Sequence, residues 1–252
     1  NRYLFSLFSK GSGAATMVAI HPFCALRYNP DVVRDLGSVL APSYDVIGPE
    51  EQERLHQRSP YNVVRLTLGQ SSPEDTDAEN RYTLAQREFA AWRERRVLRA
   101  DPAPAIYLTE QRFRSGGSTR SRLGFIALLA LDDSVERAVH RHEATLEAPK
   151  HDRTRLLEAV PATLEPIFCV VPDAQGEIQA LLQTLTSEAA PTAQAAFQEE
   201  TVRMWALTQP RAIQELARRL ASSSVLIADG HHRFEVALAH RHRYGALMTY
   251  FV

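Results

Sequence analysis

The sequence predicts an α/β or α+β protein, built on a mixed sheet with flanking helices. Apolar stretches of strand length alternate along the chain with stretches of helical periodicity, and turn residues join two pairs of neighbouring strands as hairpins. The chain has 252 residues, of which 44% are hydrophobic and 23% charged. A chain of this length and composition can bury a substantial core.

The first third of the chain is divided by prolines. Residues 18–40 suggest a short strand followed by a proline-containing loop. Pro49, followed by two glutamates, opens a helix that Pro60 ends, because carboxylates stabilise a helix N-terminus and proline fits its first turn. The stretch YNVVRLTLG, residues 61–69, has the β-branched alternation of a strand.

The middle of the chain predicts one long helix and one hairpin. Residues 70–80 are polar and acidic and predict a loop, and residues 80–99 carry apolar side chains at helical spacing. Two apolar stretches, 104–113 and 122–131, flank the glycine-containing turn RSGGSTR. This pattern is typical of a β-hairpin.

The remaining elements alternate between helix and strand. Helices are expected at about 149–160, 174–189 and 210–223, strands at 166–173 and 224–228, and a weaker hairpin within 193–208. The last residues, ALMTYFV, predict a strand that stops without a turn or polar tail. We therefore expect a C-terminal portion to be missing, together with a strand partner.

The two ends of the chain suggest its organisation. Residues 1–16 are apolar and then rich in Gly, Ala and Ser, so we expect a leader that is foreign to the native protein, with Met17 as the native start. Residues 17–252 are expected to form a single α/β domain or two closely packed lobes. No apolar run approaches the roughly 20 residues of a membrane helix, so no membrane partner is expected.

The net charge and the cysteine content limit which partners and which cellular compartment we expect. The formal net charge is −1, which gives no overall electrostatic reason to bind nucleic acid. Cys24 and Cys169 each lie in an apolar stretch and predict buried, reduced thiols in a cytoplasmic protein. The expected partner is a small-molecule or nucleotide ligand, and the sequence leaves the oligomeric state open.

The strongest chemical signal is the corner ADGHHR, where an apolar strand turns into a helix. Gly230 permits a positive φ and a close backbone approach, and the free N–H groups of the first helical turn attract phosphate or carboxylate. Arg233 is unfavourable at a helix N-terminus unless an anion is bound. The alternative is structural: Asp229 caps the helix, Gly230 only makes the turn, and His231 and His232 are partly exposed.

Two other segments carry similar chemistry. Residues 140–155 gather several titratable side chains, although a solvated helical face would also explain them: His142, Glu143, Lys150 and Arg153. Tyr44 and Asp45 follow Pro42 just before a helix, where Asp is often only a turn or cap residue. Active sites are commonly assembled from loops and helix starts of this kind.

Several motifs occur in the order found in one known family: APSYDVIGPEE, YNVVRL, HEATLEAPKHDR, LEPIFCVV and ADGHHRFEVAL. The chain thereby resembles a bacterial and archaeal family catalogued as domain of unknown function 1015, from about Val18 to Val252. The D-G-H-H-R corner alone is similar to the phosphate-binding corner of the ParB and sulfiredoxin-like superfamily, which includes free-serine kinases. That resemblance implies phosphate contacts by Gly230, His231, His232 and Arg233, and leaves Asp229 as a metal ligand or base.

The preferred hypothesis is a nucleotide- or phosphate-binding enzyme that transfers a phosphoryl group to or from a small hydroxylated metabolite such as serine, using Mg²⁺ with ATP or ADP. Such chemistry needs positioning, charge neutralisation and a base. The expected catalytic residues are Asp229, His231, His232 and Glu143. The expected phosphate or nucleotide ligands are Gly230, His231, His232, Arg233, Lys150 and Arg153, with Tyr44, Asp45 and His142 at the substrate and Asp229 at the metal.

Two alternatives remain. A metal-dependent hydrolase or phosphatase would hold Zn²⁺ or Mn²⁺ through His142, His151, His231 and Asp229. The H-E-x-x-H spacing is absent, because Leu146 stands where the second histidine would be. A non-catalytic nucleotide-sensing module would use the same anion cradle without turnover.

Overall fold

The computed structural model describes residues 18–252. Its main element is a mixed sheet with the strand order β6-β10-β7-β11-β5-β4-β9-β8, and β1 pairs with β5 at one side. The β10–β6 and β11–β7 pairs are parallel and the others antiparallel. The strands are β1 (Ile20–His21), β4 (Ile106–Ser115), β5 (Ser118–Ala130), β6 (Val139–His140), β7 (Ile167–Val170), β8 (Ala193–Phe197), β9 (Glu200–Leu207), β10 (Val225–Asp229) and β11 (Ala246–Phe251).

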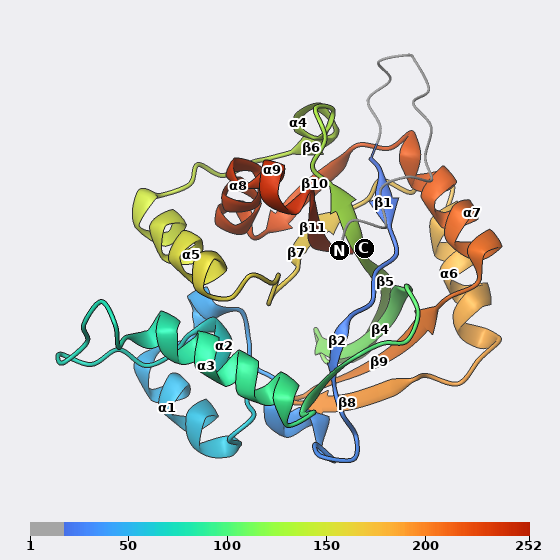
Figure 1. Cartoon of the computed structure of the whole chain (residues 1–252). Coiled ribbons are helices and arrows are strands. Elements are labelled where there is room, and N and C mark those ends of the chain that lie inside the picture. The colour runs from blue at the N-terminus through green and yellow to red at the C-terminus, as the bar shows by residue number, and fades with distance from the viewer. Residues whose placement is uncertain (1–17) are drawn as a thin grey trace.

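Helices flank this sheet, which confirms the predicted fold class (Figure 1). Helices α6 (Glu177–Ser187) and α7 (Pro210–Ala221) lie together and bury their apolar side chains in the main core, which also contains Leu247 and Phe251 of β11. On the other side lie α4 (Val135–Ala138), α5 (Glu147–Ala159), α8 (His231–Ala239) and α9 (Arg241–Tyr244). Helices α5 and α8 pack side by side.

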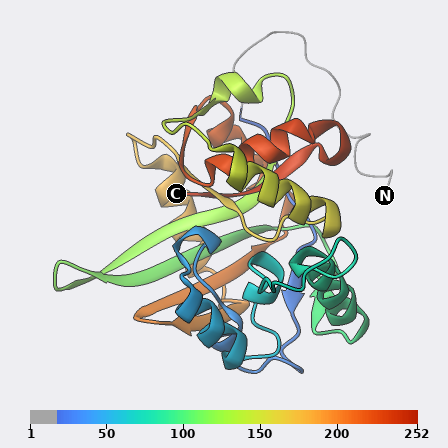
Figure 2. The same ribbon diagram turned by 90° about the vertical axis from the view of Figure 1, so that its left-hand side faces the viewer.

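A smaller lobe precedes the long β4–β5 hairpin, which projects from the molecule in Figure 2. Its own core surrounds the buried Trp92. A third cluster, of Tyr82, Ala85, Leu156 and Val160, packs α3 against α5 and so attaches this lobe to the rest. The lobe contains β2 (Leu26–Tyr28), η1 (Leu36–Val39), η2 (Tyr44–Val46), α1 (Pro49–Arg58), α2 (Val64–Thr67), α3 (Arg81–Glu94) and β3 (Leu98–Ala100).

The prediction of a strand at residues 61–69 is wrong. The segment forms the short helix α2 instead, because Asn62 directs it. The fully buried Asn62 side chain donates to the carbonyl oxygens of Ser38 and Leu40, and its own oxygen accepts from the Val64 N–H. A side chain that bonds nearby backbone groups in this way competes with strand pairing.

Two further expectations change. Strand β11 lies between β7 and β5, so the strand partner that we expected to be missing is present within the chain. Cys169 is buried as predicted, whereas Cys24 is exposed. The expectation for residues 1–16 lies outside the described residues. From residue 18 onward, none of the helices has the length and apolar character needed to cross a membrane.

Candidate functional site

The corner at the start of α8 has the form that the sequence predicts. Strand β10 ends at Asp229, Gly230 has φ 94°, and α8 begins at His231 without a side-chain cap. A Cβ atom on Gly230 would lie 2.9 Å from Ile167 Cγ2 and 3.1 Å from Arg233 Nε. Glycine is therefore required here both by the positive φ and by the close packing of these two side chains.

Arg233 folds back across Gly230. Its Nη2 atom donates to the Asp229 carboxylate and its Nη1 atom to the carbonyl oxygen of Pro166. The Nε atom is buried and has no hydrogen-bond partner among the described residues. Asp229 is thus neither a helix cap nor a free carboxylate. It forms an ion pair with Arg233, although 44% of the Asp229 side chain is exposed.

The two histidines of the corner turn toward the segment before α5. The buried His231 ring packs edge-on against His142, with ring centroids 4.6 Å apart, and its Nδ1 atom lies 3.5 Å from the Glu143 carboxylate. His232 Nε2 accepts a hydrogen bond of 3.0 Å from the Leu146 N–H. The structure therefore brings residues 140–155 to the corner, but both imidazoles are used in protein contacts.

Lys150 and Arg153, both on α5, have different surroundings. Lys150 pairs with Glu147 and Glu235, and Glu235 belongs to α8. Arg153 is buried, donates through both Nε and Nη2 to the same Asp152 oxygen, Oδ2, and donates through Nη1 to the Thr67 carbonyl oxygen. Arg153 rather than Lys150 consequently connects α5 with the smaller lobe.

The Tyr44–Asp45 loop reaches the same place from the smaller lobe. The Tyr44 ring stacks on the Arg153 guanidinium, whose Cζ atom lies 3.8 Å from the ring centroid. The Tyr44 N–H donates to the carboxylate of Glu165. Asp45 is exposed at the edge of the loop, so it adds a charge to the rim of the site.

Glu165 is the residue that sequence reasoning missed. Its carboxylate is 3.7 Å from Arg153 Nη1 and only 15% of the side chain is exposed. Burial raises the pKa of Glu165, and the positive charges of Arg233 and Arg153 oppose that rise. An acidic residue directly before Pro166 and the apolar strand β7, inside the quoted stretch LEPIFCVV, was the available signal.

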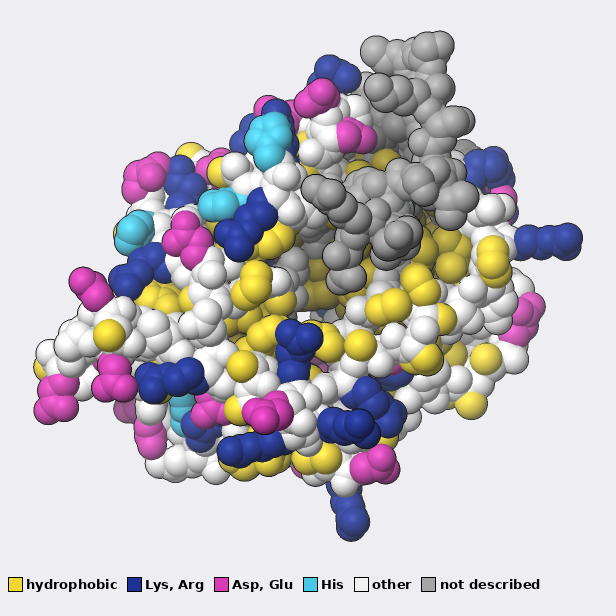
Figure 3. All heavy atoms as spheres, viewed as in Figure 1, with side chains coloured by type: hydrophobic (Ala, Val, Ile, Leu, Met, Phe, Trp, Pro, Cys, Tyr) yellow, Lys and Arg dark blue, Asp and Glu magenta, His cyan; other side chains and the backbone are white. Residues whose placement is uncertain are grey.

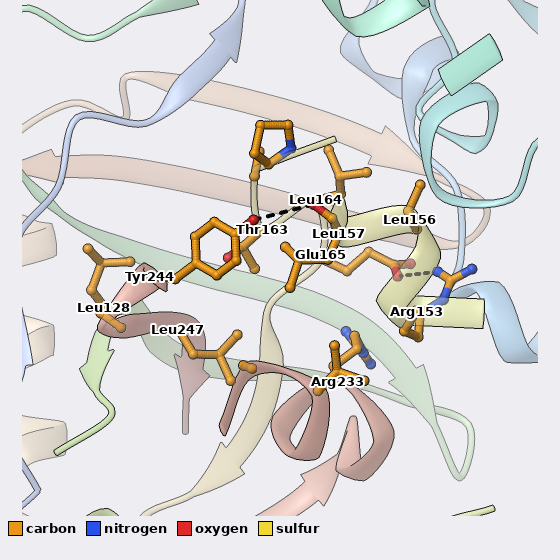
Figure 4. A pocket seen from close by; sticks show the side chains of 15 residues that line it. Leu128, Arg153, Leu156, Leu157, Thr163, Leu164, Glu165, Arg233, Tyr244 and Leu247 are labelled. Atoms are coloured by element: carbon orange, nitrogen blue, oxygen red, sulfur yellow. Dashed lines mark hydrogen bonds and ion pairs between the residues drawn. The ribbon is translucent and has the colours of Figure 1, made fainter. Parts of the chain in front are cut away.

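A pocket of about 280 Å³ opens beside these charged groups. Arg153, Glu165 and Arg233 lie at one end of it, and aliphatic side chains such as Leu128 and Leu247 lie at the other (Figure 4). Figure 3 shows that this face of the molecule is hollowed and that hydrophobic side chains line the hollow. The arrangement suits a ligand with one polar end and one apolar end.

The described residues do not supply the metal ligands that the hydrolase alternative requires. Within residues 18–252, no three His, Cys, Asp or Glu side chains gather closely enough to hold a metal ion. Of the four expected ligands, His142 and His231 touch each other, Asp229 is bonded to Arg233, and His151 is exposed on α5.

Comparison with known families gives one match. The family described as "Protein of unknown function (DUF1015)" matches residues 20–248. The chain belongs to this family. The DUF1015 match confirms the first resemblance drawn from the sequence, whereas the likeness to ParB and sulfiredoxin-like proteins stays a prediction. No curated protein and no solved structure matched the chain.

The burial of His231 gives a testable pH dependence. Burial, followed by the neighbouring His142, lowers the pKa of His231 from 6.5. The folded state therefore binds this proton more weakly than the unfolded state, and stability falls as the pH drops from 6.5 through the lowered pKa. We expect His231→Gln to remove this loss, measured as urea unfolding of both proteins between pH 7.5 and 5; parallel pH profiles would contradict the assignment.

Proposed function

We propose that the protein is a nucleotide- or phosphate-binding enzyme that transfers a phosphoryl group to or from a small hydroxylated metabolite. One observation carries the proposal: four segments from three separate regions of the sequence bring charged side chains close to the uncapped start of α8. They contribute Asp229 and Arg233, Arg153, Glu165, and the Tyr44–Asp45 loop.

The parts suit the chemistry of phosphoryl transfer. The first-turn N–H groups of α8 and the Arg233 guanidinium would bind phosphate oxygens, because helix N-termini and arginine forks both favour that group. Arg233 uses one Nη atom on Asp229 and the other on Pro166. Since each Nη atom carries two N–H groups, the guanidinium keeps donors for a phosphate.

Mg²⁺ would be bound by the nucleotide phosphates together with Asp229, whose carboxylate is more exposed than that of Glu165. A magnesium ion is commonly held by one or two carboxylates and substrate phosphates rather than by a full protein cage. The metal would supply charge neutralisation at the transferring group. Asp229 would then exchange its bond with Arg233 for the metal.

Isothermal titration calorimetry with ATP and ADP, with and without Mg²⁺, tests the proposal. Arg233→Ala should weaken nucleotide binding roughly 10- to 100-fold, since a hydrogen bond to a charged group contributes about 1.5–3 kcal/mol. Arg243→Ala, which removes an equal charge from an exposed position on α9, is the matched control and should bind normally.

Arg233→Lys guards against a folding defect, because it keeps the charge beside Asp229 but loses the fork of donors. We expect intermediate nucleotide affinity for this variant. Production of ADP from Mg-ATP then separates an enzyme from a nucleotide-sensing module. A folded wild-type protein that binds neither nucleotide would overturn the proposal.

A further inference from the structure

The pocket beside Arg233 is far more apolar than a site for serine requires. Its walls come from the second half of α5, the segment 161–165, α8 and the start of β11. Leu156, Leu157 and Leu164 lie on one side and Leu247 on the other (Figure 4), and Val236 also lines the pocket. Among the lining residues, charge is confined to Arg153, Glu165 and Arg233.

A second apolar pocket, of about 380 Å³, adjoins the first. The two share Leu128 and the residues 162–164, which we name the strap, so this stretch of chain lies between them. Phe23, Phe89 and Met248 line the second pocket. The apolar space therefore continues past the strap, away from the charged end.

The charged end lies directly against the proposed phosphate corner. Arg233 donates to the Pro166 carbonyl oxygen, and the next residue, Ile167, packs against Gly230. Glu165 directly precedes these two residues and lines the pocket. A group bound at the inner end of the pocket would thus be next to both a carboxylate and a phosphate held at the corner.

Building on the function proposed above, we propose that this pocket binds the aliphatic body of the hydroxylated substrate and places its hydroxyl group beside Glu165. The substrate class is then an alcohol with a hydrocarbon chain. A purely polar metabolite such as serine would leave the leucine walls without an apolar partner.

The hydroxyl oxygen attacks the γ-phosphorus of ATP and forms the new O–P bond, while the bond between that phosphorus and the β,γ-bridging oxygen breaks. The leaving electron pair stays on ADP, and the hydroxyl proton goes to the Glu165 carboxylate. A buried carboxylate with a raised pKa is a stronger base than an exposed one, which agrees with this role.

Binding of straight-chain alcohols from 1-propanol to 1-hexanol, followed by ligand-observed NMR on the full chain, tests the pocket. Affinity should rise about fourfold with each added methylene, and serine should not compete. Ala237→Leu, which fills the buried pocket wall on α8, should weaken 1-hexanol binding more than tenfold. Ala239→Leu, the same change at an exposed position of the same helix, is the matched control.

Nucleotide titrations on the same variants separate the two proposals. Ala237→Leu should keep the wild-type affinity for ATP, and Arg233→Ala should bind ATP roughly 10- to 100-fold more weakly but still bind 1-hexanol. Should Ala237→Leu protein be unstable, Ala246→Leu fills the same pocket from β11. If Ala237→Leu and Ala246→Leu lose affinity for ATP as well as for 1-hexanol, the pocket belongs to the nucleotide and this inference is overturned.

Glu165→Gln tests the base. It should bind both ATP and 1-hexanol, while formation of ADP and hexyl phosphate falls at least about 100-fold. Wild-type protein that binds ATP but no alcohol refutes the pocket assignment and leaves the proposed function intact. The proposed function is refuted instead if the wild-type protein does not bind ATP but does bind 1-hexanol, and Ala237→Leu weakens that alcohol binding. Transfer that persists in Glu165→Gln removes the role of this carboxylate.

Discussion

Replacement of Arg153 by methionine should lower the free energy of unfolding by about 3 kcal/mol. The side chain is only 6% exposed and bonds Asp152, the Thr67 carbonyl oxygen and, more distantly, Glu165. Removal of one partner from a buried pair typically costs about 3–5 kcal/mol. We expect the low end of that range, because Asp152 keeps Arg81 and the Tyr82 hydroxyl as partners, while the Thr67 carbonyl oxygen loses the Arg153 donor. Urea denaturation at pH 7.5 measures the effect.

Arg155→Met is the matched control. Arg155 lies two residues further along α5, is exposed, and stacks over the Tyr82 ring. A surface change of this kind should alter the free energy of unfolding by less than about 1 kcal/mol. If the two substitutions lowered the free energy of unfolding equally, the buried hydrogen bonds and ion pairs of Arg153 would add no more to stability than the surface contact of Arg155.

Gly230→Ala should have the largest combined effect on stability and function. A residue with a Cβ at φ 94° is strained, and that atom would crowd Ile167 and Arg233 at 2.9 and 3.1 Å. Backbone strain of about 1–3 kcal/mol and the steric displacement both act. We expect a loss of about 3 kcal/mol in the free energy of unfolding, together with weakened ATP binding as Arg233 moves.

Gly176→Ala is the control that separates backbone strain from steric crowding. Gly176 also precedes a helix with positive φ, at 67°, but nothing lies within 4 Å of an added Cβ. Its destabilisation should be about 1 kcal/mol, from backbone strain alone. If Gly230→Ala behaves like Gly176→Ala in thermal unfolding and calorimetry, the packing at the corner is looser than the structure indicates.

The sequence predicted those elements whose signals are local. The hairpin around Gly116, the helix that begins after Asn80 and the strand that ends at Asp229 all follow from periodicity and turn chemistry. The prediction of a strand at residues 61–69 was wrong because a buried side chain, Asn62, bonds backbone groups more than twenty residues away. Such tertiary bonds leave no trace in local hydrophobic alternation.

The candidate site was predicted in part for a similar reason. Its segments were found because each gathers titratable residues, and the structure brings them together. The detailed pairing could not be predicted: Arg233 engages Asp229, and His231 is buried against His142. Glu165 escaped notice because a single carboxylate acquires its chemistry only from burial, which depends on the folded chain.

The place of β11 has a consequence for how the protein reaches its native state. In the main sheet this strand alone joins β6, β10 and β7 to β5, β4, β9 and β8. It occupies residues 246–251, so among the described residues the two halves of the sheet can only unite once synthesis has passed residue 251. Assembly is thereby delayed by long-range pairing, and nascent chains stalled before Ala246 should expose two open sheet edges to chaperones.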